Sequence, residues 1–124
     1  LWMETVHEMG IALEVIDIAA ASIPKELPDA RVTKVFLTVG RLAAVVPESL
    51  RFCFQVASEQ TRLAGAELVI EQVAVNARCR QCDHAWSIDT PAFRCPACDS
   101  GDIDIVSGRE LDIRSIEIEE NSPP

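Results

Sequence analysis

The first third of the chain begins with apolar residues at helical spacing. From about His7 to Ala21 they recur every three or four residues, as in an amphipathic helix with one buried face. Thr5 followed by Glu8 fits a capping box, and Pro24 ends the pattern. The sequence therefore predicts a helix over residues 7–21. Its expected buried stripe consists of Ile11, Ala12, Val15, Ile16, Ile18 and Ala19.

The next two segments predict a strand and a second helix. In residues 31–40, RVTKVFLTVG, β-branched and other apolar side chains alternate with polar ones, which is typical of a strand. Pro47 then stands where a helix accepts proline, at its first position. Cys53 falls on the apolar face of this helix, and we expect it to be a small buried side chain. The apolar positions of the helix, which extends to about residue 60, are Leu50, Cys53, Phe54 and Ala57.

The second half of the chain predicts strands on either side of a cysteine-rich insertion. Residues 66–76, AELVIEQVAVN, are rich in β-branched residues and predict one strand that leads directly to Cys79. Residues 102–106 and 109–120 alternate Ile or Leu with acids, which predicts a ribbon or two short strands with one charged face. The alternation changes phase near Arg114, where a bulge or bend would restore the register. The final strand must then return to the sheet that precedes the insertion.

These elements predict an α/β fold in which two helices pack on a small mixed β-sheet, with an inserted four-cysteine lobe. A chain of 124 residues, 48% of them hydrophobic, suits one compact domain with a small appended module. We expect residues 1–77 to form the α/β domain, completed by the C-terminal strand 101–120. Residues 78–100 form the expected lobe, held by something other than a hydrophobic core, and residues 121–124 a tail.

The lobe contains two cysteine pairs at the spacing of a zinc site. Cys79 and Cys82 are two residues apart, twelve residues follow, and Cys95 and Cys98 repeat the spacing. A two-residue gap lets a tight turn direct both sulfurs at one ion, and four thiolates complete a tetrahedron with no open position for a catalytic water. The pattern predicts a structural zinc site. Iron in a rubredoxin-like site and a redox dithiol are the alternatives.

Three other residues of the lobe bear on this site. Trp86 and Phe93 are expected to cover the metal-binding turns. His84 could replace a cysteine as ligand or contact one of the ligands, but four cysteines already suffice. We therefore expect His84 to be an exposed or packed loop residue.

The charge of the chain excludes some functions. Twenty acidic residues against eleven Lys and Arg give a net charge of −9, which disfavours binding to nucleic acid or to an anionic membrane. Zinc ribbons that bind nucleic acid surround the metal with basic residues, whereas this lobe is rich in aspartate. These aspartates are Asp83, Asp89, Asp99, Asp102 and Asp104.

Neither a targeting segment nor a catalytic motif is evident. No apolar run reaches the roughly 18 residues of a membrane span, and no signal peptide is recognisable, so we expect a cytoplasmic protein. In that reducing compartment, clustered cysteines favour metal binding over disulfides. The sequence contains no P-loop, dinucleotide-binding turn, nucleophile elbow or His-Glu-x-x-His motif. We expect a protein that is not an enzyme.

His7 and Glu8 open the first predicted helix and form a second candidate site. Ni(II) favours square-planar nitrogen donors, which an imidazole beside backbone nitrogens supplies. Amides in a first helical turn have no intrahelical acceptor, and a glutamate offsets the positive helix end near a cation. The residues alone leave two interpretations open, a metal site or a solvated first turn with a capping glutamate.

Three features together resemble the HypA family of hydrogenase-maturation nickel metallochaperones, over nearly the whole chain. They are the start HEMGIALEVI, the two-helix α/β body, and the lobe with Cys79, Cys82, Cys95 and Cys98. The resemblance implies a structural zinc ion held by the four cysteines. It also implies that nickel binds at the N-terminus, with His7 as imidazole ligand and Glu8 contributing its backbone nitrogen and electrostatic assistance.

The same resemblance implies partners. Nickel would be delivered together with a partner GTPase of the HypB type to the large subunit of [NiFe]-hydrogenase. A second copy of the chain, in a homodimer, is a further candidate partner. The alternative function is that of an acidic zinc-ribbon scaffold for protein interactions that does not handle nickel.

The chain departs from the family pattern at its start. Members of the family begin Met-His-Glu, whereas LWMETV precedes His7 here, so a free α-amino ligand next to His7 would be missing. Either the mature protein begins at Val6, through a valine codon read as methionine, or the extension is real and nickel binding is altered.

We expect the first explanation. The intact mass of the protein expressed from its native gene should then correspond to a chain that lacks Leu1–Thr5. A mature protein that retains these residues would contradict this expectation.

Overall fold

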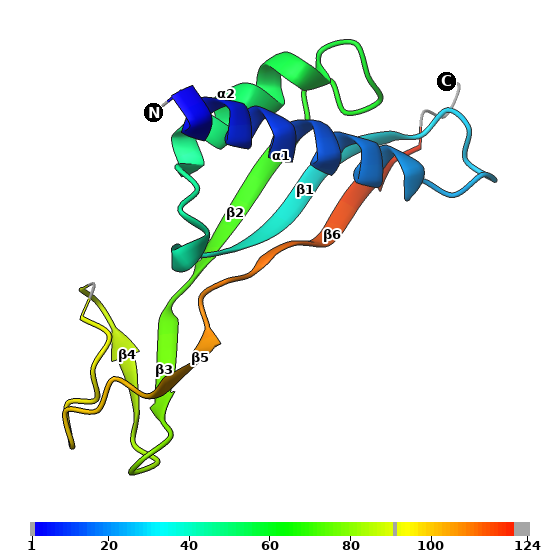
Figure 1. The fold of residues 1–124 in the computed structure, drawn as a ribbon. Coiled ribbons are helices and arrows are strands. Elements are labelled where there is room, and N and C mark those ends of the chain that lie inside the picture. The colour runs from blue at the N-terminus through cyan, green and yellow to red at the C-terminus, as the bar shows by residue number, and fades with distance from the viewer. Residues whose placement is uncertain (1, 91, 121–124) are drawn as a thin grey trace. The chain divides into compact units, whose positions relative to one another are not determined.

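The computed structural model describes residues 2–90 and 92–120, with side chains from residue 8 onward. The helices are α1 (Trp2–Ala21) and α2 (Pro47–Ser58), with a short 3-10 helix η1 (Arg41–Ala43) between them (Figure 1). The strands are β1 (Arg31–Gly40), β2 (Glu67–Val73), β3 (Val75–Cys79), β4 (Ala85–Ile88), β5 (Ile103–Ser107) and β6 (Leu111–Glu119). None of the described helices combines the length and the apolarity that a membrane crossing requires.

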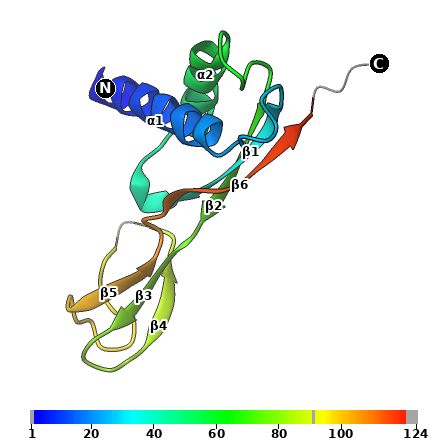
Figure 2. The ribbon, with the colours of Figure 1, turned by 90° about the vertical axis from the view of Figure 1, so that its right-hand side faces the viewer.

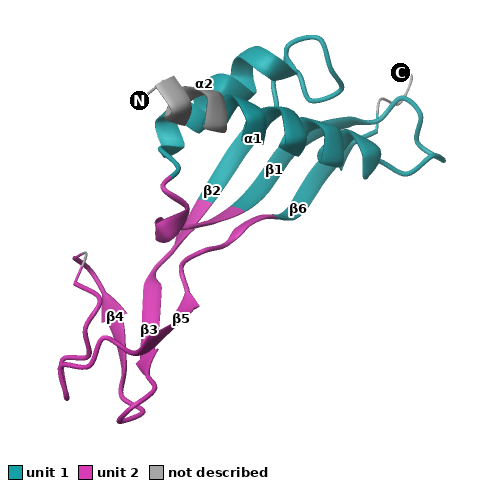
Figure 3. Cartoon of the chain, in the orientation of Figure 1, with its two compact units in different colours: residues 1–37, 45–70, 113–124 teal, residues 38–44, 71–112 magenta. Residues whose placement is uncertain are grey.

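The described strands form two three-stranded sheets, in the orders β2-β1-β6 and β4-β3-β5. The chain also divides into two compact units, shown in Figure 3. Unit 1 comprises residues 1–37, 45–70 and 113–124, and unit 2 comprises residues 38–44 and 71–112.

The sheet β2-β1-β6 is mixed, and both helices lie on one of its faces (Figure 2). β1 and β2 run in the same direction and β6 in the opposite one. Parallel neighbours need a long crossover connection, which η1 and α2 supply here. β6 pairs with β1 although β3, β4 and β5 intervene in the sequence, so the final strand does return to the earlier sheet. The predicted fold class is confirmed.

The core of unit 1 follows the predicted apolar pattern, with one exception. Val35 and Leu37 of β1 are buried, as are five of the six stripe residues of α1. Ile18 is 48% exposed, so its predicted burial is wrong. A helical residue is turned by about 100° from the next one, which places Ile18 at the margin of the stripe, one step away from the fully buried Ala19.

The predicted start of the first helix is also wrong. α1 begins at Trp2 rather than near His7, so Thr5 lies inside the helix and is not its N-cap. Residues 2–6 contain neither Gly nor Pro, and nothing in them interrupts a helix that continues through Ala21.

The single strand predicted over residues 66–76 is two strands in different sheets. β2 belongs to the sheet with β1, and β3 to the sheet with β4 and β5. The burial pattern changes phase between them: Leu68 is buried at an even position, whereas Val75, Ala77 and Cys79 are buried at odd positions. Because alternate residues of a strand face opposite sides, a change of phase marks the passage from one sheet to another.

The sheet of unit 2 has a small core of its own. β3 pairs antiparallel with β4, where Val75 lies opposite Ile88, and antiparallel with β5. Val75, Ala77 and Ile88 are buried, and Trp86 packs against them. β4, which sequence analysis missed, contributes Trp86 and Ile88 to this cluster, whereas Val75 and Ala77 lie outside the predicted lobe. Residues 103–107 were expected to complete the first sheet, but they form β5 and pair with β3. The proposed domain boundaries stay a prediction.

Two glycines meet within unit 2 at a distance that no side chain permits. A Cβ atom on Gly40 would lie 2.1 Å from the carbonyl carbon of Gly108, and Gly108 itself has a φ of 116°. The Gly40 N–H donates to the carbonyl of Glu110 at 2.6 Å, and the Leu42 N–H donates to that of Gly108 at 2.8 Å. These bonds fix the two backbone segments against each other.

We expect Gly40→Ala to lower the free energy of unfolding by about 1–3 kcal/mol, because the added methyl group forces two backbones apart. The measurement is urea denaturation of the zinc-loaded protein. Gly101→Ala is the matched control, since nothing lies within 4 Å of its added Cβ atom. Equal stability of the two variants would contradict the inferred close approach.

Candidate metal centre

The four predicted ligands converge at one point of unit 2. The sulfur atoms of Cys79, Cys82, Cys95 and Cys98 all lie within 4.8 Å of one another. The distances from Cys79 Sγ to Cys98 Sγ and from Cys82 Sγ to Cys95 Sγ are both 3.5 Å. Zinc–sulfur bonds of about 2.3 Å would place tetrahedral sulfurs about 3.8 Å apart. The cluster therefore fits a four-thiolate zinc site.

The two halves of the cluster are built in the same way. The N–H of Asp83 donates to the carbonyl of Cys79, and the N–H of Asp99 donates to that of Cys95. Both aspartates have left-handed backbones, with φ of 66° and 63°, a conformation that Asp tolerates better than most residues. The repeated sequence Cys-x-x-Cys-Asp contained this signal, which sequence analysis did not use.

In each half, a backbone N–H donates to the sulfur of the first cysteine, and a backbone hydrogen bond joins the two ends of the turn. The Gln81 N–H donates to Cys79 Sγ at 3.3 Å, and the Ala97 N–H donates to Cys95 Sγ at 3.4 Å. The N–H of Cys79 donates to the carbonyl of His84, and that of Cys95 to the carbonyl of Ser100. Each turn is thus complete within six residues, and it presents its sulfurs without help from the other.

The electrostatics of the cluster favour a bound cation. Backbone N–H groups, that of Cys82 first, lower the pKa of Cys79 to about 7. The Ser100 N–H also favours the thiolate of Cys98, but the neighbouring thiols and desolvation outweigh it and raise the pKa of Cys98 to about 12. Four adjacent sulfurs cannot all carry negative charge without compensation, and a divalent metal ion supplies that compensation.

The aspartates around the cluster are largely engaged with arginines. Arg80 donates to Asp104 and Asp102, and hydrogen bonding to Arg80 lowers the pKa of Asp104. Arg94 Nη1 lies 3.5 Å from the carboxylate of Asp99. These exposed pairs add little stability, but they reduce the local excess of negative charge. The described cluster of metal-donor groups contains the four cysteines alone.

The other lobe residues considered as part of the site are not among the clustered metal donors. The exposed ring of His84 stacks on Trp86, with centroids 5.9 Å apart and planes inclined by 12°. Phe93 is 43% exposed and lines a small pocket together with Leu42 and Ile88. Outside the lobe, the predicted burial of Cys53 is confirmed, because the residue is 3% exposed on α2.

The second candidate site is described in part. The side chain of His7 lies outside the described residues. Glu8 is described, and its position was not predicted: it is 2% exposed, and its Oε2 accepts a hydrogen bond of 2.6 Å from the N–H of Val46. The expectation that the amides of residues 7 and 8 belong to a first helical turn is wrong, because α1 begins at Trp2.

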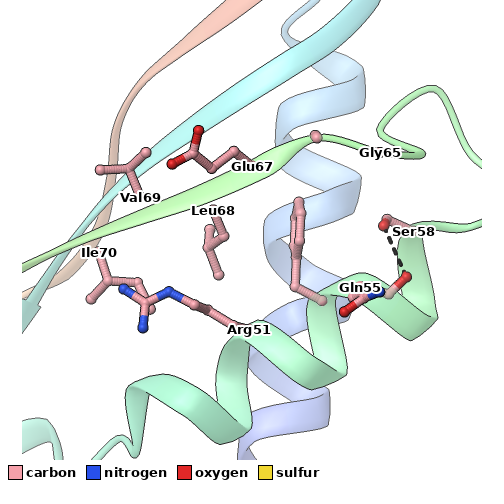
Figure 4. Close-up of a pocket in the computed structure, with 10 residues that line it drawn as sticks. Arg51, Gln55, Ser58, Gly65, Glu67, Leu68, Val69 and Ile70 are labelled. Carbon is pink, nitrogen blue, oxygen red and sulfur yellow. Dashed lines mark hydrogen bonds between the residues drawn. The ribbon is translucent and has the colours of Figure 1, made fainter.

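A pocket of about 450 Å³ lies between α2 and β2 in unit 1 (Figure 4). Arg51 and Gln55 of α2 and Leu68 and Ile70 of β2 are among its lining residues, which include neither His nor Cys. The Ser58 hydroxyl donates to the carbonyl of Gln55 and is not aligned with a base. The pocket therefore offers no catalytic pair and no set of metal donors.

The fold and the cysteine cluster define a class, that of small α/β proteins with a closed four-thiolate metal site. A family model described as "Hydrogenase/urease nickel incorporation, metallochaperone, hypA" matches residues 6–118. The chain belongs to this HypA family of nickel metallochaperones.

Individual proteins agree with this family assignment. A hydrogenase maturation factor HypA from Desulfosudis oleivorans is 56% identical over 114 residues, which are 92% of this chain and 99% of that protein. Another, from Desulfatibacillum aliphaticivorans, is 49% identical over 90% of this chain and 86% of its own.

Two solved structures share the fold at 20% sequence identity. The solution structure of the nickel metallochaperone HypA from Helicobacter pylori has a TM-score of 0.62 and covers 89% of this chain and 95% of its own. A further solution structure of a HypA protein has a TM-score of 0.67, with coverages of 94% and 98%.

We expect Cys79→Ser to abolish stoichiometric zinc binding, because three thiolates and a poorly ionised hydroxyl do not complete the tetrahedron. Metal content by mass spectrometry should report the loss of zinc, and the amide spectrum of residues 79–100 should report that the two turns are no longer held against each other. Cys53→Ala is the control and should retain one zinc ion per chain. Retention of one zinc ion per chain in Cys79→Ser would contradict the proposed ligand set.

Proposed function

We propose that this chain captures one Ni(II) ion at the N-terminal part of α1 and delivers it to the large subunit of [NiFe]-hydrogenase with a partner GTPase of the HypB type. The observation that carries the proposal is the family match over residues 6–118, at whose beginning His7 and Glu8 stand. The chemistry of these two residues supports their part in nickel binding, and family membership supports the GTPase and the hydrogenase as partners.

The zinc site and the nickel site have separate tasks in this proposal. Cys79, Cys82, Cys95 and Cys98 would hold zinc, which ties two separately formed turns together and supplies no reaction. Nickel, as cargo, would bind through the His7 imidazole and nearby backbone nitrogens, the donors that Ni(II) prefers. The protein would then act by transfer rather than by catalysis. We place it in the cytoplasm, where the cysteines stay reduced.

The start of α1 at Trp2 determines which backbone nitrogens are free to bind nickel. Only the first four N–H groups of an α-helix lack an intrahelical acceptor, and residues 7 and 8 lie beyond them in a helix that begins at Trp2. A backbone nitrogen at these positions could join the metal only if the preceding turn opens. A chain that begins with methionine at position 6, followed by His7 and Glu8, would have no preceding turn to open. Its terminal amine would also be a further nitrogen donor for the metal.

We expect the zinc-loaded 124-residue protein to bind one nickel ion in a calorimetric titration, and His7→Ala to weaken this binding at least about tenfold, or about 1.4 kcal/mol. His84→Ala is the matched control, because His84 is the other histidine of the chain, and it should bind as the unmodified protein does. The shortened chain should bind more tightly than the full one.

The alternative function, an acidic scaffold that does not handle nickel, predicts the opposite result. It requires no one-to-one nickel event in either the full or the shortened chain. If His7→Ala and the unmodified protein bind nickel equally, the assignment of the site to His7 fails.

A further inference from the structure

Glu8 is one of two buried polar or charged residues among the described side chains, and it lies on α1. At 2% exposure its carboxylate has little access to water. A buried charge is tolerated only where it is hydrogen-bonded, and Oε2 meets this need by accepting from the Val46 N–H at 2.6 Å. Both residues belong to unit 1.

Val46 is the N-cap residue of α2, and this helix lacks a cap of its own. The Val46 side chain is apolar and makes no capping hydrogen bond of its own. Pro47, the first helical residue, has no N–H to be satisfied. In a capping box, a glutamate three residues into the helix accepts from the N-cap N–H, but Ser49 stands at that place here. Here Glu8 of α1 supplies the acceptor for the N-cap N–H.

The helix dipole adds to the hydrogen bond. The N-terminus of α2 carries a partial positive charge, so a carboxylate is favoured there. Turning Glu8 toward a metal ion would leave the Val46 N–H without its acceptor and would take the carboxylate away from the dipole. The contact therefore competes with metal ligation by the same side chain.

We propose that Glu8 is a positioning residue: its carboxylate caps α2, fixes the rotation of α1 at this point, and so holds the nickel-binding turn in place without contacting the metal. The inference rests on the proposed function for its second half. Because neighbouring helical residues differ by about 100° around the axis, fixing the helix at Glu8 also fixes the preceding position, where the proposed nickel ligand stands.

Three variants of the zinc-loaded protein test this inference. Glu8→Gln keeps a side-chain oxygen of the same reach and removes the charge, Glu8→Ala removes the acceptor, and Glu14→Ala removes an exposed acid from the same helix as a control. The first readout, taken without nickel, is hydrogen exchange of the Val46 amide. We expect protection in the unmodified protein, in Glu8→Gln and in Glu14→Ala, and its loss in Glu8→Ala.

The second readout is nickel affinity. Glu8→Gln and Glu14→Ala should bind nickel within about threefold of the unmodified protein, and Glu8→Ala should bind about tenfold more weakly or worse. If Glu8→Gln keeps the Val46 amide protected but loses nickel affinity, the carboxylate charge acts on the metal and the inference is overturned. If the Val46 amide exchanges freely in the unmodified protein, the cap does not exist.

The outcomes separate this inference from the proposed function. Absence of nickel binding in the unmodified protein, together with a protected Val46 amide that Glu8→Ala exposes, refutes the nickel site and leaves the cap intact. Should Glu8→Ala not fold, as judged by circular dichroism, Glu8→Gln decides alone: retained affinity supports the positioning role, and lost affinity overturns it.

Discussion

The close approach of four cysteine sulfurs is the constraint on which the second half of this protein depends. All four sulfur atoms lie within 4.8 Å of one another. Among the described residues of their unit, the apolar cluster consists of three buried residues and three partly buried ones. So small a core cannot offset the entropy of ordering the surrounding loops. A divalent ion can, because it neutralises the thiolates and joins the two turns at once. The same coordination leaves no open position for chemistry, which is consistent with a metallochaperone whose cargo binds elsewhere.

Sequence patterns predicted the elements well wherever one face of an element is buried against a single partner. β1 has the bounds that its alternation of Val35 and Leu37 indicated, and the spacing of the cysteines identified the cluster. The start of α1 and the division between β2 and β3 were missed, because neither involves a helix-breaking or strand-breaking residue. The division between β2 and β3 depends on which strands each segment pairs with, and this information lies elsewhere in the chain.

Glu8 shows the same limit at a single residue. Its sequence context, directly after His7 and three residues after Thr5, suggested a local cap or an assisting charge, and both interpretations consider the first helix alone. Its partner is an N–H 38 residues away, at a helix start that has no cap of its own. The N-terminus of α2 lacks a cap of its own, and α1 carries a buried carboxylate. The two facts can be connected from sequence only once the two helices are known to pack together.

The likeness of the two cysteine turns bears on the order in which the lobe can form. Each turn closes through contacts no more than five residues apart, so each can form early and independently, as local contacts do. Joining the two then closes a short loop, and the entropic cost of that closure grows only slowly with length. Metal capture would in this way be the last step of folding, a meeting of two halves that are already shaped, rather than the event that shapes them.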